Sequence, residues 1–238
     1  KTKAHLFAKN LPKPDIIYAT STPLTVGLIG HELAKHFKCP WIFEVRDLWP
    51  EVPVQLGIIN AKWLKNYLYK LESILLKSAN QIIALSPYNK KYIDQIVPQK
   101  CTLATNFSNN ERYRFPTPNN NQFQNFRIGY FGAVSTANGL ESFIELAGYA
   151  HQNKLSEFEF VLVGAGKSKN DLEASAKGLN NITFQNHLNK VQVAEAMLTC
   201  QASYISFINN SIMQSCSPNK FFDSLASGRL IITNTPGW

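Results

Sequence analysis

Short apolar segments alternate with longer amphipathic segments along almost the whole chain. The apolar segments predict β-strands at residues 15–19, 41–45, 81–85, 126–131, 158–163, 182–185, 202–207 and 229–233. The amphipathic segments predict helices at residues 24–37, 61–79, 140–151, 171–177, 191–199 and 219–227. Nearly unbroken apolar strands are typical of a parallel sheet that helices cover on both faces. The pattern therefore predicts an α/β fold of the doubly wound type.

The alternation stops at residues 108–125, where the sequence SNNERYRFPTPNNNQFQN has no helical or strand period. We interpret this stretch, rich in asparagine and proline, as a linker. It divides the chain into two Rossmann-like domains, residues 1–107 and 126–238, and a ligand is expected in a cleft between them. Both domains are expected to be incomplete and the chain to be a fragment, because it begins with Lys1 and stops soon after a predicted strand.

Positive charge is concentrated in the first half of the chain. Residues 1–107 hold 14 of the 24 basic side chains but only 7 of the 16 acidic ones. This excess of positive charge either forms a solvated lysine-rich face or binds an anionic partner, such as a membrane surface, a phosphate-bearing lipid or nucleic acid. Nucleic acid is the weakest of these, because the basic residues form no known reading motif.

Composition narrows the class of protein further. A hydrophobic share of 45% excludes a disordered chain. The cysteines are scattered at Cys39, Cys101, Cys200 and Cys216, which favours reduced thiols over disulfides or a zinc site. No apolar run approaches the roughly 20 residues that span a bilayer, and the first residues do not resemble a signal peptide, so a cytoplasmic location is expected.

Two glycine turns follow predicted strands, at the edge of the sheet where open α/β folds bind ligands. Their glycines, Gly132, Gly139, Gly164 and Gly166, are candidates for binding a ligand. The GKS within the second turn is not a Walker A loop, because the position that needs the first glycine holds Val161. The dinucleotide fingerprint fails as well, since its third glycine would fall at Lys169. Each turn allows the close approach of a ligand or serves the fold alone.

No metal site is expected. The segment from His31 to His36 resembles a zinc-protease motif, but its second histidine lies five positions after the first instead of four. The two imidazoles therefore diverge on a helix and cannot readily share one metal ion. No pair of aspartates follows a predicted strand, so a dedicated divalent-metal site is unsupported as well.

Charged residues mark two further candidate positions. Arg46 and Asp47 directly follow the strand at residues 41–45 and form either a structural pair or part of a ligand site. The other position is the start of the last predicted helix, with candidates Ser217, Pro218, Asn219, Lys220 and Asp223. We expect Ser217 to be the N-cap, Pro218 the first helical residue and Gly228 the C-terminal cap. The helix N-terminus together with Lys220 would attract an anion, and Asp223 could accept hydrogen bonds from sugar hydroxyls.

In these motifs the sequence resembles GT-B glycosyltransferases of family four, in particular the bacterial branch that resembles fucosamine transferases. The resemblance rests on EVRDLWPE, FRIGYFGAVSTANGLESFIELA, FEFVLVGAGKSKNDL and SPNKFFDSLASGRLIIT, in the family's order and spacing. It implies an acceptor-side first domain and a second domain that holds the nucleotide sugar. The implied activity transfers the sugar with retention and without cofactor or metal. The implied donor is a nucleoside-diphosphate sugar, UDP-linked, and the acceptor is either a cell-surface polysaccharide or lipid-linked.

The resemblance also implies roles for single residues. Asp223 stands where the family's second acidic residue grips the ribose, whereas the first acidic position holds Ser215. Arg46 stands where many relatives carry histidine, and with Asp47 it is expected to orient the acceptor or the reacting face of the donor. The diphosphate-binding arginine and lysine are missing between residues 132 and 139, which leaves Lys220 and helix N-termini to stabilise the leaving group.

The helix at residues 61–79 interleaves lysines with Trp63 and Tyr69, which favours peripheral contact with an anionic membrane at the inner face of the cell membrane. Two alternatives to the transferase remain open at the level of sequence. One is a sugar-nucleotide epimerase of the same fold, and the other is a non-catalytic module of two domains that binds a small ligand.

Overall fold

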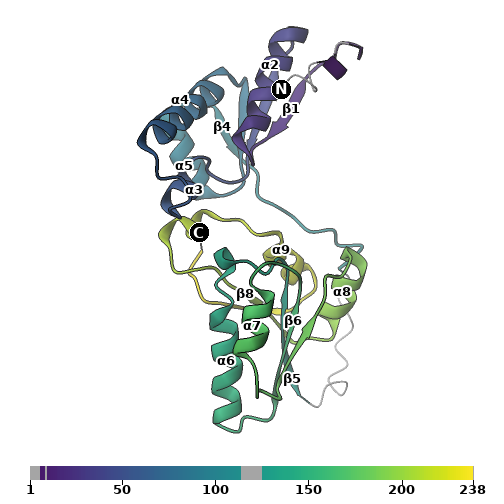
Figure 1. Cartoon of the computed structure of the whole chain (residues 1–238). Coiled ribbons are helices and arrows are strands. Elements are labelled where there is room, and N and C mark those ends of the chain that lie inside the picture. Colours follow the sequence, from purple (N-terminus) through teal and green to yellow (C-terminus); the bar gives the residue numbers. More distant parts are fainter. Residues whose placement is uncertain (1–5, 9, 114–124, 238) are drawn as a thin grey trace. The chain divides into compact units, whose positions relative to one another are not determined.

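The computed structural model describes residues 6–8, 10–113 and 125–237. The chain forms two compact units (Figure 1). Unit 1 comprises Lys1–Thr105, Gln214–Ser217 and Gly237–Trp238, and unit 2 comprises Asn106–Met213 and Pro218–Pro236. Residues 108–113, which the sequence predicts as part of a linker, belong to unit 2. The remainder of that stretch, up to residue 124, lies outside the described residues.

Unit 1 is built on a parallel sheet with strand order β1-β2-β3-β4. Its strands are β1 (Ile17–Thr20), β2 (Trp41–Val45), β3 (Gln81–Ala84) and β4 (Cys101–Leu103). Its helices are α2 (Leu24–Phe37), α3 (Glu51–Gln55), α4 (Lys62–Ser78) and α5 (Pro87–Ile96). Buried side chains alternate along β2, with Phe43 in the core, and the indole of Trp41 donates to the carbonyl of Ser78 at the end of α4 (3.0 Å). The sheet and α4 thus share one core.

A buried carboxyl joins two helices of unit 1. Glu72 on α4 is 4% exposed, and the hydroxyl of Tyr92 on α5 donates to it across 2.9 Å. Burial raises the pKa of Glu72 to about 8, and the nearby Glu51 adds to this shift. Glu72 is therefore mostly protonated at neutral pH and adds little negative charge to α4.

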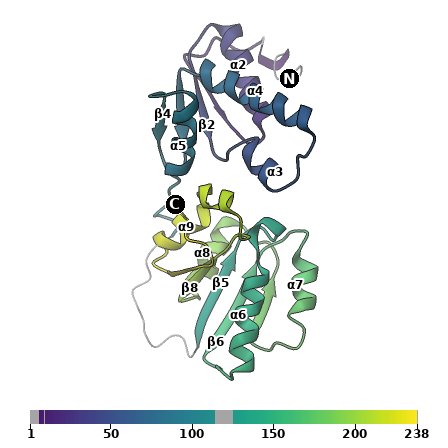
Figure 2. The ribbon, with the colours of Figure 1, turned by 90° about the vertical axis from the view of Figure 1, so that its left-hand side faces the viewer.

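Unit 2 is built on a second parallel sheet, with strand order β7-β6-β5-β8-β9. Its strands are β5 (Phe126–Phe131), β6 (Phe158–Val163), β7 (Ile182–Gln185), β8 (Ala202–Ile205) and β9 (Leu230–Thr233). Its helices are α6 (Glu141–Gln152), α7 (Lys169–Ser175), α8 (Lys190–Leu198) and α9 (Asn219–Ala226), with short 3₁₀ turns at η1 (Thr136–Asn138) and η2 (Ser211–Ser215). Figure 2 shows β5 and β6 of this sheet next to α6.

The strand β6 shows why this sheet is covered on both faces. Phe160 and Leu162 belong to the core cluster that includes residues of α6 and α7, whereas Val161 and Val163 belong to the cluster that includes residues of α8. Successive side chains of a strand point to opposite faces, so both faces of β6 are buried under helices. The predicted doubly wound α/β fold is confirmed.

The helices α3 and α5 and the strand β4 were not predicted from the sequence, and neither were the short turns η1 and η2. The short α3 contains Pro53, and β4 has only three residues, so neither shows a period. The helix α5 is mostly polar, but its start carries a signal: Ser86 accepts from the N–H of Asn89 (3.1 Å), and Pro87 follows the cap. All four cysteines are free thiols. Among the described residues, none of the helices has the length and apolarity needed to cross a membrane.

Candidate functional site

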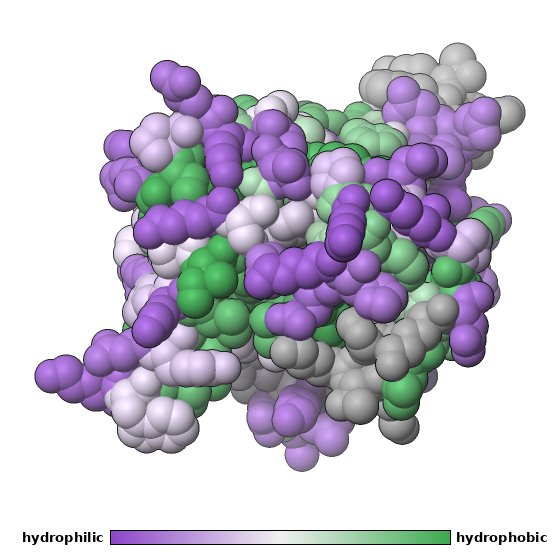
Figure 3. Space-filling model, turned by 90° about the horizontal axis from the view of Figure 1, so that it is seen from above, coloured by the Kyte–Doolittle hydropathy of each residue, from purple (hydrophilic) through white to green (hydrophobic). Residues whose placement is uncertain are grey.

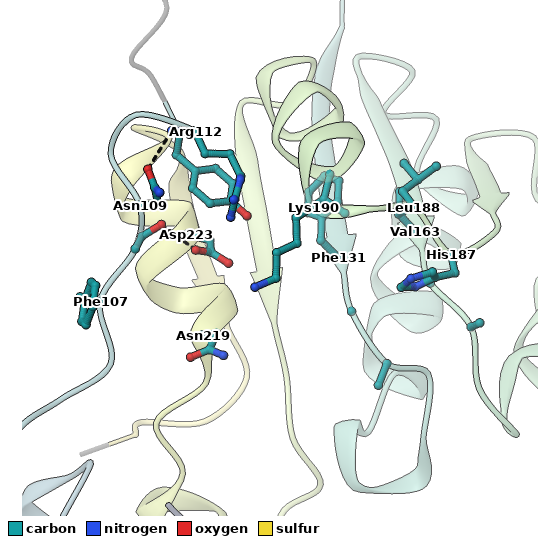
Figure 4. Close-up of a pocket in the computed structure, with 17 residues that line it drawn as sticks. Phe107, Asn109, Arg112, Phe131, Val163, His187, Leu188, Lys190, Asn219 and Asp223 are labelled. Carbon is teal, nitrogen blue, oxygen red and sulfur yellow. Dashed lines mark hydrogen bonds between the residues drawn. The ribbon is translucent and has the colours of Figure 1, made fainter. Parts of the chain in front are cut away.

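Unit 2 contains a cavity of about 520 Å³ at the carboxyl ends of β5 and β6 (Figure 4). It is lined by Phe107, Ser108, Asn109, Arg112, Tyr113, Phe131, Gly132, Ala133, Val163, Gly164, Ala165, His187, Leu188, Lys190, Val193, Asn219 and Asp223. We call this cavity the unit 2 pocket. Its position agrees with the general rule that open α/β sheets bind ligands at the carboxyl ends of their strands.

The two predicted glycine turns meet at one wall of the pocket. The N–H of Gly132 donates to the carbonyl of Val163, and the N–H of Val134 donates to the carbonyl of Ala165, each across 3.0 Å. A Cβ atom at Gly164 would lie 2.0 Å from the carbonyl oxygen of Gly132. Glycine is therefore required at position 164 for the turns to touch, and the turns form a rigid wall.

The other two candidate glycines do not line the pocket. A Cβ atom at Gly166 would lie 1.9 Å from the carbonyl oxygen of Val134, so this residue serves the contact between the turns. Gly139 adopts a φ of 54° and packs against the backbone of Phe207 and Ile208 before α6 begins. The structure explains both glycines by packing.

Positive side chains enter the pocket from two elements. Arg112 comes from the segment before β5, and Lys190 is the first residue of α8. Figure 4 shows the amine of Lys190 extended into the space between α9 and His187. Among the described residues, Asp223 is the only acidic one that lines the pocket, so Arg112 and Lys190 leave this lining with a net positive charge when His187 is neutral. A pocket of this kind favours an anionic ligand.

Asp223 is fixed at the wall that α9 forms. Its carboxylate accepts from the hydroxyl of Ser108 across 2.6 Å (Figure 4). The hydroxyl of Tyr113 also faces this carboxylate: burial and the charge of Asp223 together raise the pKa of Tyr113 to about 12. The remaining lone pairs of a carboxylate held in this way can accept from the hydroxyl groups of a ligand.

The start of α9 differs from the prediction. The helix begins at Asn219, and Pro218, with φ of −74° and ψ of 134°, is the N-cap. Ser217 is therefore not the N-cap, and Pro218 is not the first helical residue, because the backbone of Pro218 is still extended. Asn219 lines the pocket, whereas Ser217 and Pro218 do not. Gly228 follows the helix with a φ of 62°, as expected of a C-terminal glycine.

Lys220 lies next to the pocket but does not line it. Its amine donates to the hydroxyl of Tyr130 across 2.8 Å and lies 4.3 Å from the centre of the Tyr130 ring. Burial lowers the pKa of this amine to about 8. A Cβ atom at Gly132 would lie only 3.3 Å from the amine nitrogen, so Lys220 is directly behind the pocket wall.

Arg46 and Asp47 lie in unit 1, at the carboxyl end of β2. The hydroxyl of Ser21 accepts from the N–H of Arg46 (3.1 Å) and donates to the carbonyl of Asp47 (3.3 Å). The hydroxyl of Thr22 donates to the Asp47 carboxylate across 3.2 Å. These bonds connect the ends of β1 and β2, while the expected role of Arg46 and Asp47 toward a substrate stays a prediction.

Ser215, at the position of the missing acidic residue, is buried.

Several pocket residues were missed by the sequence analysis, and two signals could have found them. Asn109 accepts from the N–H groups of Glu111 and Arg112 (2.9 and 3.1 Å), an ordered turn that an Asn-rich stretch permits. The spacing of Asn189 and Gln192 is that of a capping box, which places Lys190 at the first position of α8. Among the described residues, no group of three or more His, Cys, Asp or Glu side chains is arranged to hold a metal ion.

No model of a known protein family matches the sequence, and no curated protein matches it either. Solved structures do resemble it. Anabaena HepE in complex with UDP and glucose aligns with 99% of this chain and 62% of its own, at a TM-score of 0.72 and 16% identity. Sucrose-phosphate synthase from Thermosynechococcus elongatus aligns with 98% of this chain and 59% of its own, at a TM-score of 0.70 and 14% identity. The lipopolysaccharide outer core galactosyltransferase WaaB, in its apo form, aligns with 98% of this chain and 59% of its own, at a TM-score of 0.61 and 12% identity.

This chain therefore spans less than two thirds of the length of these three structures. At such low identity the likeness establishes the fold alone: two units, each built on a parallel α/β sheet, as in GT-B glycosyltransferases.

Proposed function

We propose that this chain is part of a retaining glycosyltransferase whose donor, a nucleoside-diphosphate sugar, binds in the unit 2 pocket. The acceptor is a cell-surface polysaccharide or a lipid-linked glycan. The observation that carries the proposal is the composition of the pocket. Two cations, Arg112 and Lys190, and one carboxylate, Asp223, line the same cavity at the carboxyl ends of parallel strands. The complex of HepE with UDP and glucose, which has the same fold, supports this choice of donor.

Each part of such a donor has a complementary feature in the pocket. Arg112 and Lys190 offer N–H donors and positive charge to a diphosphate. Asp223, oriented by Ser108, can accept from sugar hydroxyl groups. Phe107, Phe131 and other apolar side chains supply surface for a base. The pocket thus combines an apolar surface with a small number of polar groups, as ligand sites do.

The chemistry requires charge stabilisation at the leaving group. When the bond between the sugar and the phosphate breaks, negative charge grows on the departing diphosphate. Fixed cations near the phosphate stabilise this transition state more than the ground state. We assign this role to Lys220, with binding of the diphosphate shared by Arg112 and Lys190. In the same proposal, Arg46 and Asp47 orient the acceptor or the reacting face of the donor, and no metal ion takes part.

The proposal gives the two parts of the chain different tasks. Residues 126–238 hold the nucleotide sugar, and residues 1–107 serve the acceptor except for Phe107, which lines the unit 2 pocket. The stretch 108–125 connects the two parts, and its first residues line the pocket as well. The transferase is favoured over an epimerase or a binding module by the resemblance of its motifs, and product analysis with and without an acceptor separates the three.

The donor proposal predicts that UDP and UDP-sugars raise the melting temperature of the full-length protein. Changing Asp223→Asn is expected to weaken UDP binding about tenfold or more, because a hydrogen bond to a charged group is worth about 1.5–3 kcal/mol. Isothermal titration calorimetry measures the effect, and Asp171→Asn on the exposed surface of α7 is the matched control. If no nucleoside diphosphate or its sugar binds the wild-type protein, the proposed function is wrong.

We further propose that unit 1 contacts an anionic membrane at the cytoplasmic side. On α4, Trp63, Tyr67 and Ile74 are 72%, 58% and 47% exposed. The helix also carries four lysines, at positions 62, 65, 70 and 77, whereas its one carboxyl, Glu72, is buried. Seen from above, the molecule shows hydrophilic side chains gathered around smaller hydrophobic areas (Figure 3). Aromatic and basic side chains on one helix favour the interface of an anionic bilayer.

Flotation with vesicles tests this contact. Full-length protein is expected to float with vesicles that contain phosphatidylglycerol and not with neutral vesicles. The double change Lys70→Gln and Lys77→Gln is expected to weaken partition roughly 30-fold, at about 1 kcal/mol for each lysine. Changing Lys154 and Lys177 of unit 2 to glutamine removes the same charge and serves as the control. Equal flotation of both double variants would contradict a membrane contact through α4.

A further inference from the structure

We propose that Tyr130 is a positioning residue for Lys220: its hydroxyl joins the lysine amine to the turn that forms the pocket wall. This inference rests on the proposed function, because it assigns Lys220 to the stabilisation of an anion. Tyr130 itself is completely buried in β5 and does not line the pocket. It acts on a ligand only through Lys220.

The hydrogen bonds around Tyr130 have a defined direction. The Tyr130 hydroxyl donates to the carbonyl of Ala133 across 2.5 Å, which occupies its single proton. The oxygen therefore meets the amine of Lys220 as an acceptor, across 2.8 Å. Ala133 lies in the turn after β5 and lines the pocket, so the hydroxyl connects α9 to that turn.

The contact also fixes where the amine lies. The nitrogen of Lys220 lies over the Tyr130 ring, 4.3 Å from its centre, and the site of a Cβ at Gly132 is 3.3 Å away. A flexible lysine side chain is thus held between an aromatic ring and a residue that lines the pocket. An anion placed against Gly132 would meet a cation that is already oriented, which avoids the cost of ordering it during the reaction.

The phenol favours the charged form of the amine. Burial lowers the pKa of Lys220 to about 8, since the ammonium loses its hydration. A hydrogen bond that the ammonium donates counteracts this loss. Removal of the hydroxyl leaves the ring and its attraction for the cation in place but takes away the acceptor. The fraction of Lys220 that is protonated at neutral pH should therefore fall in Tyr130→Phe.

The experiment compares Tyr130→Phe with Tyr204→Phe in the full-length protein. Tyr204 is the matched control, because it is also buried in unit 2 and its hydroxyl bonds to Ser142 (2.9 Å). UDP affinity is measured between pH 6.5 and 9.5. For the wild type and the control we expect it to decrease as pH rises through the Lys220 pKa of about 8. For Tyr130→Phe we expect the decrease to begin about one pH unit lower.

A second measurement separates this inference from the proposed function. The Lys220 amine is titrated by NMR in the free protein, where the wild type should titrate near pH 8 and Tyr130→Phe at lower pH. If the protein binds no UDP but the titration shifts, the proposed function fails and the positioning role stands. If Tyr130→Phe titrates and binds like Tyr204→Phe, the positioning role is overturned. In the Lys220→Met background, Tyr130→Phe should cause no further loss of UDP affinity.

Discussion

Replacing Lys220 with methionine is expected to lower the rate of sugar transfer about 100- to 1,000-fold, the cost of removing one fixed donor from a transition state in comparable sites. Methionine fills the same space without a charge. Because burial disfavours the ammonium of Lys220, the variant should fold at least as well as the wild type. Transfer from a radiolabelled UDP-sugar by the full-length protein gives the rate, and thermal unfolding checks the fold.

Two controls make this result specific to Lys220. Lys177→Met removes an exposed lysine from the turn that follows α7 and should leave the rate of sugar transfer unchanged. The loss in Lys220→Met should be larger in kcat than in the affinity for UDP, since the charge on the diphosphate grows in the transition state. A Lys220→Met protein that folds and transfers sugar at the wild-type rate would show that the leaving group is stabilised elsewhere.

Gly164→Ala is expected to destabilise unit 2 by about 3 kcal/mol or more, at the upper end of the cost of overpacking. The new methyl carbon would lie 2.0 Å from the carbonyl oxygen of Gly132, and neither backbone can move without breaking the contact between the two turns. The wall of the pocket would then separate, so UDP binding should be lost as well. Denaturant unfolding and calorimetry measure the two effects.

Gly148→Ala is the matched control for this change. Gly148 lies within α6, and no atom outside its own helix lies within 4 Å of the site where its Cβ would be. Alanine is the better helix former, so Gly148→Ala should be neutral or stabilise the protein by up to about 1 kcal/mol. If Gly164→Ala were as stable as Gly148→Ala and still bound UDP, the turns would not form a rigid wall.

The strands β5 and β6 are well predicted from the sequence, because burial of four consecutive residues in each leaves a nearly continuous apolar run. The strands β5, β6 and β7 begin and end as expected, and α2 does too. The mostly polar α5 and the three-residue β4 carry no such run. Their positions depend on packing in the folded chain, and only the cap at Ser86 and Pro87 marks the start of α5.

The candidate site shows a similar division. Gly132, Gly164, Asn219 and Asp223 were found because glycine turns and helix starts have local patterns, and all four line the pocket. Arg112 was missed because its stretch has the composition of a linker. The contact between Lys220 and Tyr130 joins residues that are 90 positions apart, and no local pattern predicts a contact at that separation.

The partner of Lys220 in the structure has a consequence for selectivity. The amine donates to a neutral phenol, so this hydrogen bond gives the cation a neighbour without an opposite charge. A free sugar or an uncharged nucleoside could satisfy the shape of the cavity and still leave that charge uncompensated. The protein would then distinguish a nucleotide-sugar donor from the hydrolysed sugar mainly by the negative charge that neutralises Lys220, and only secondarily by steric fit.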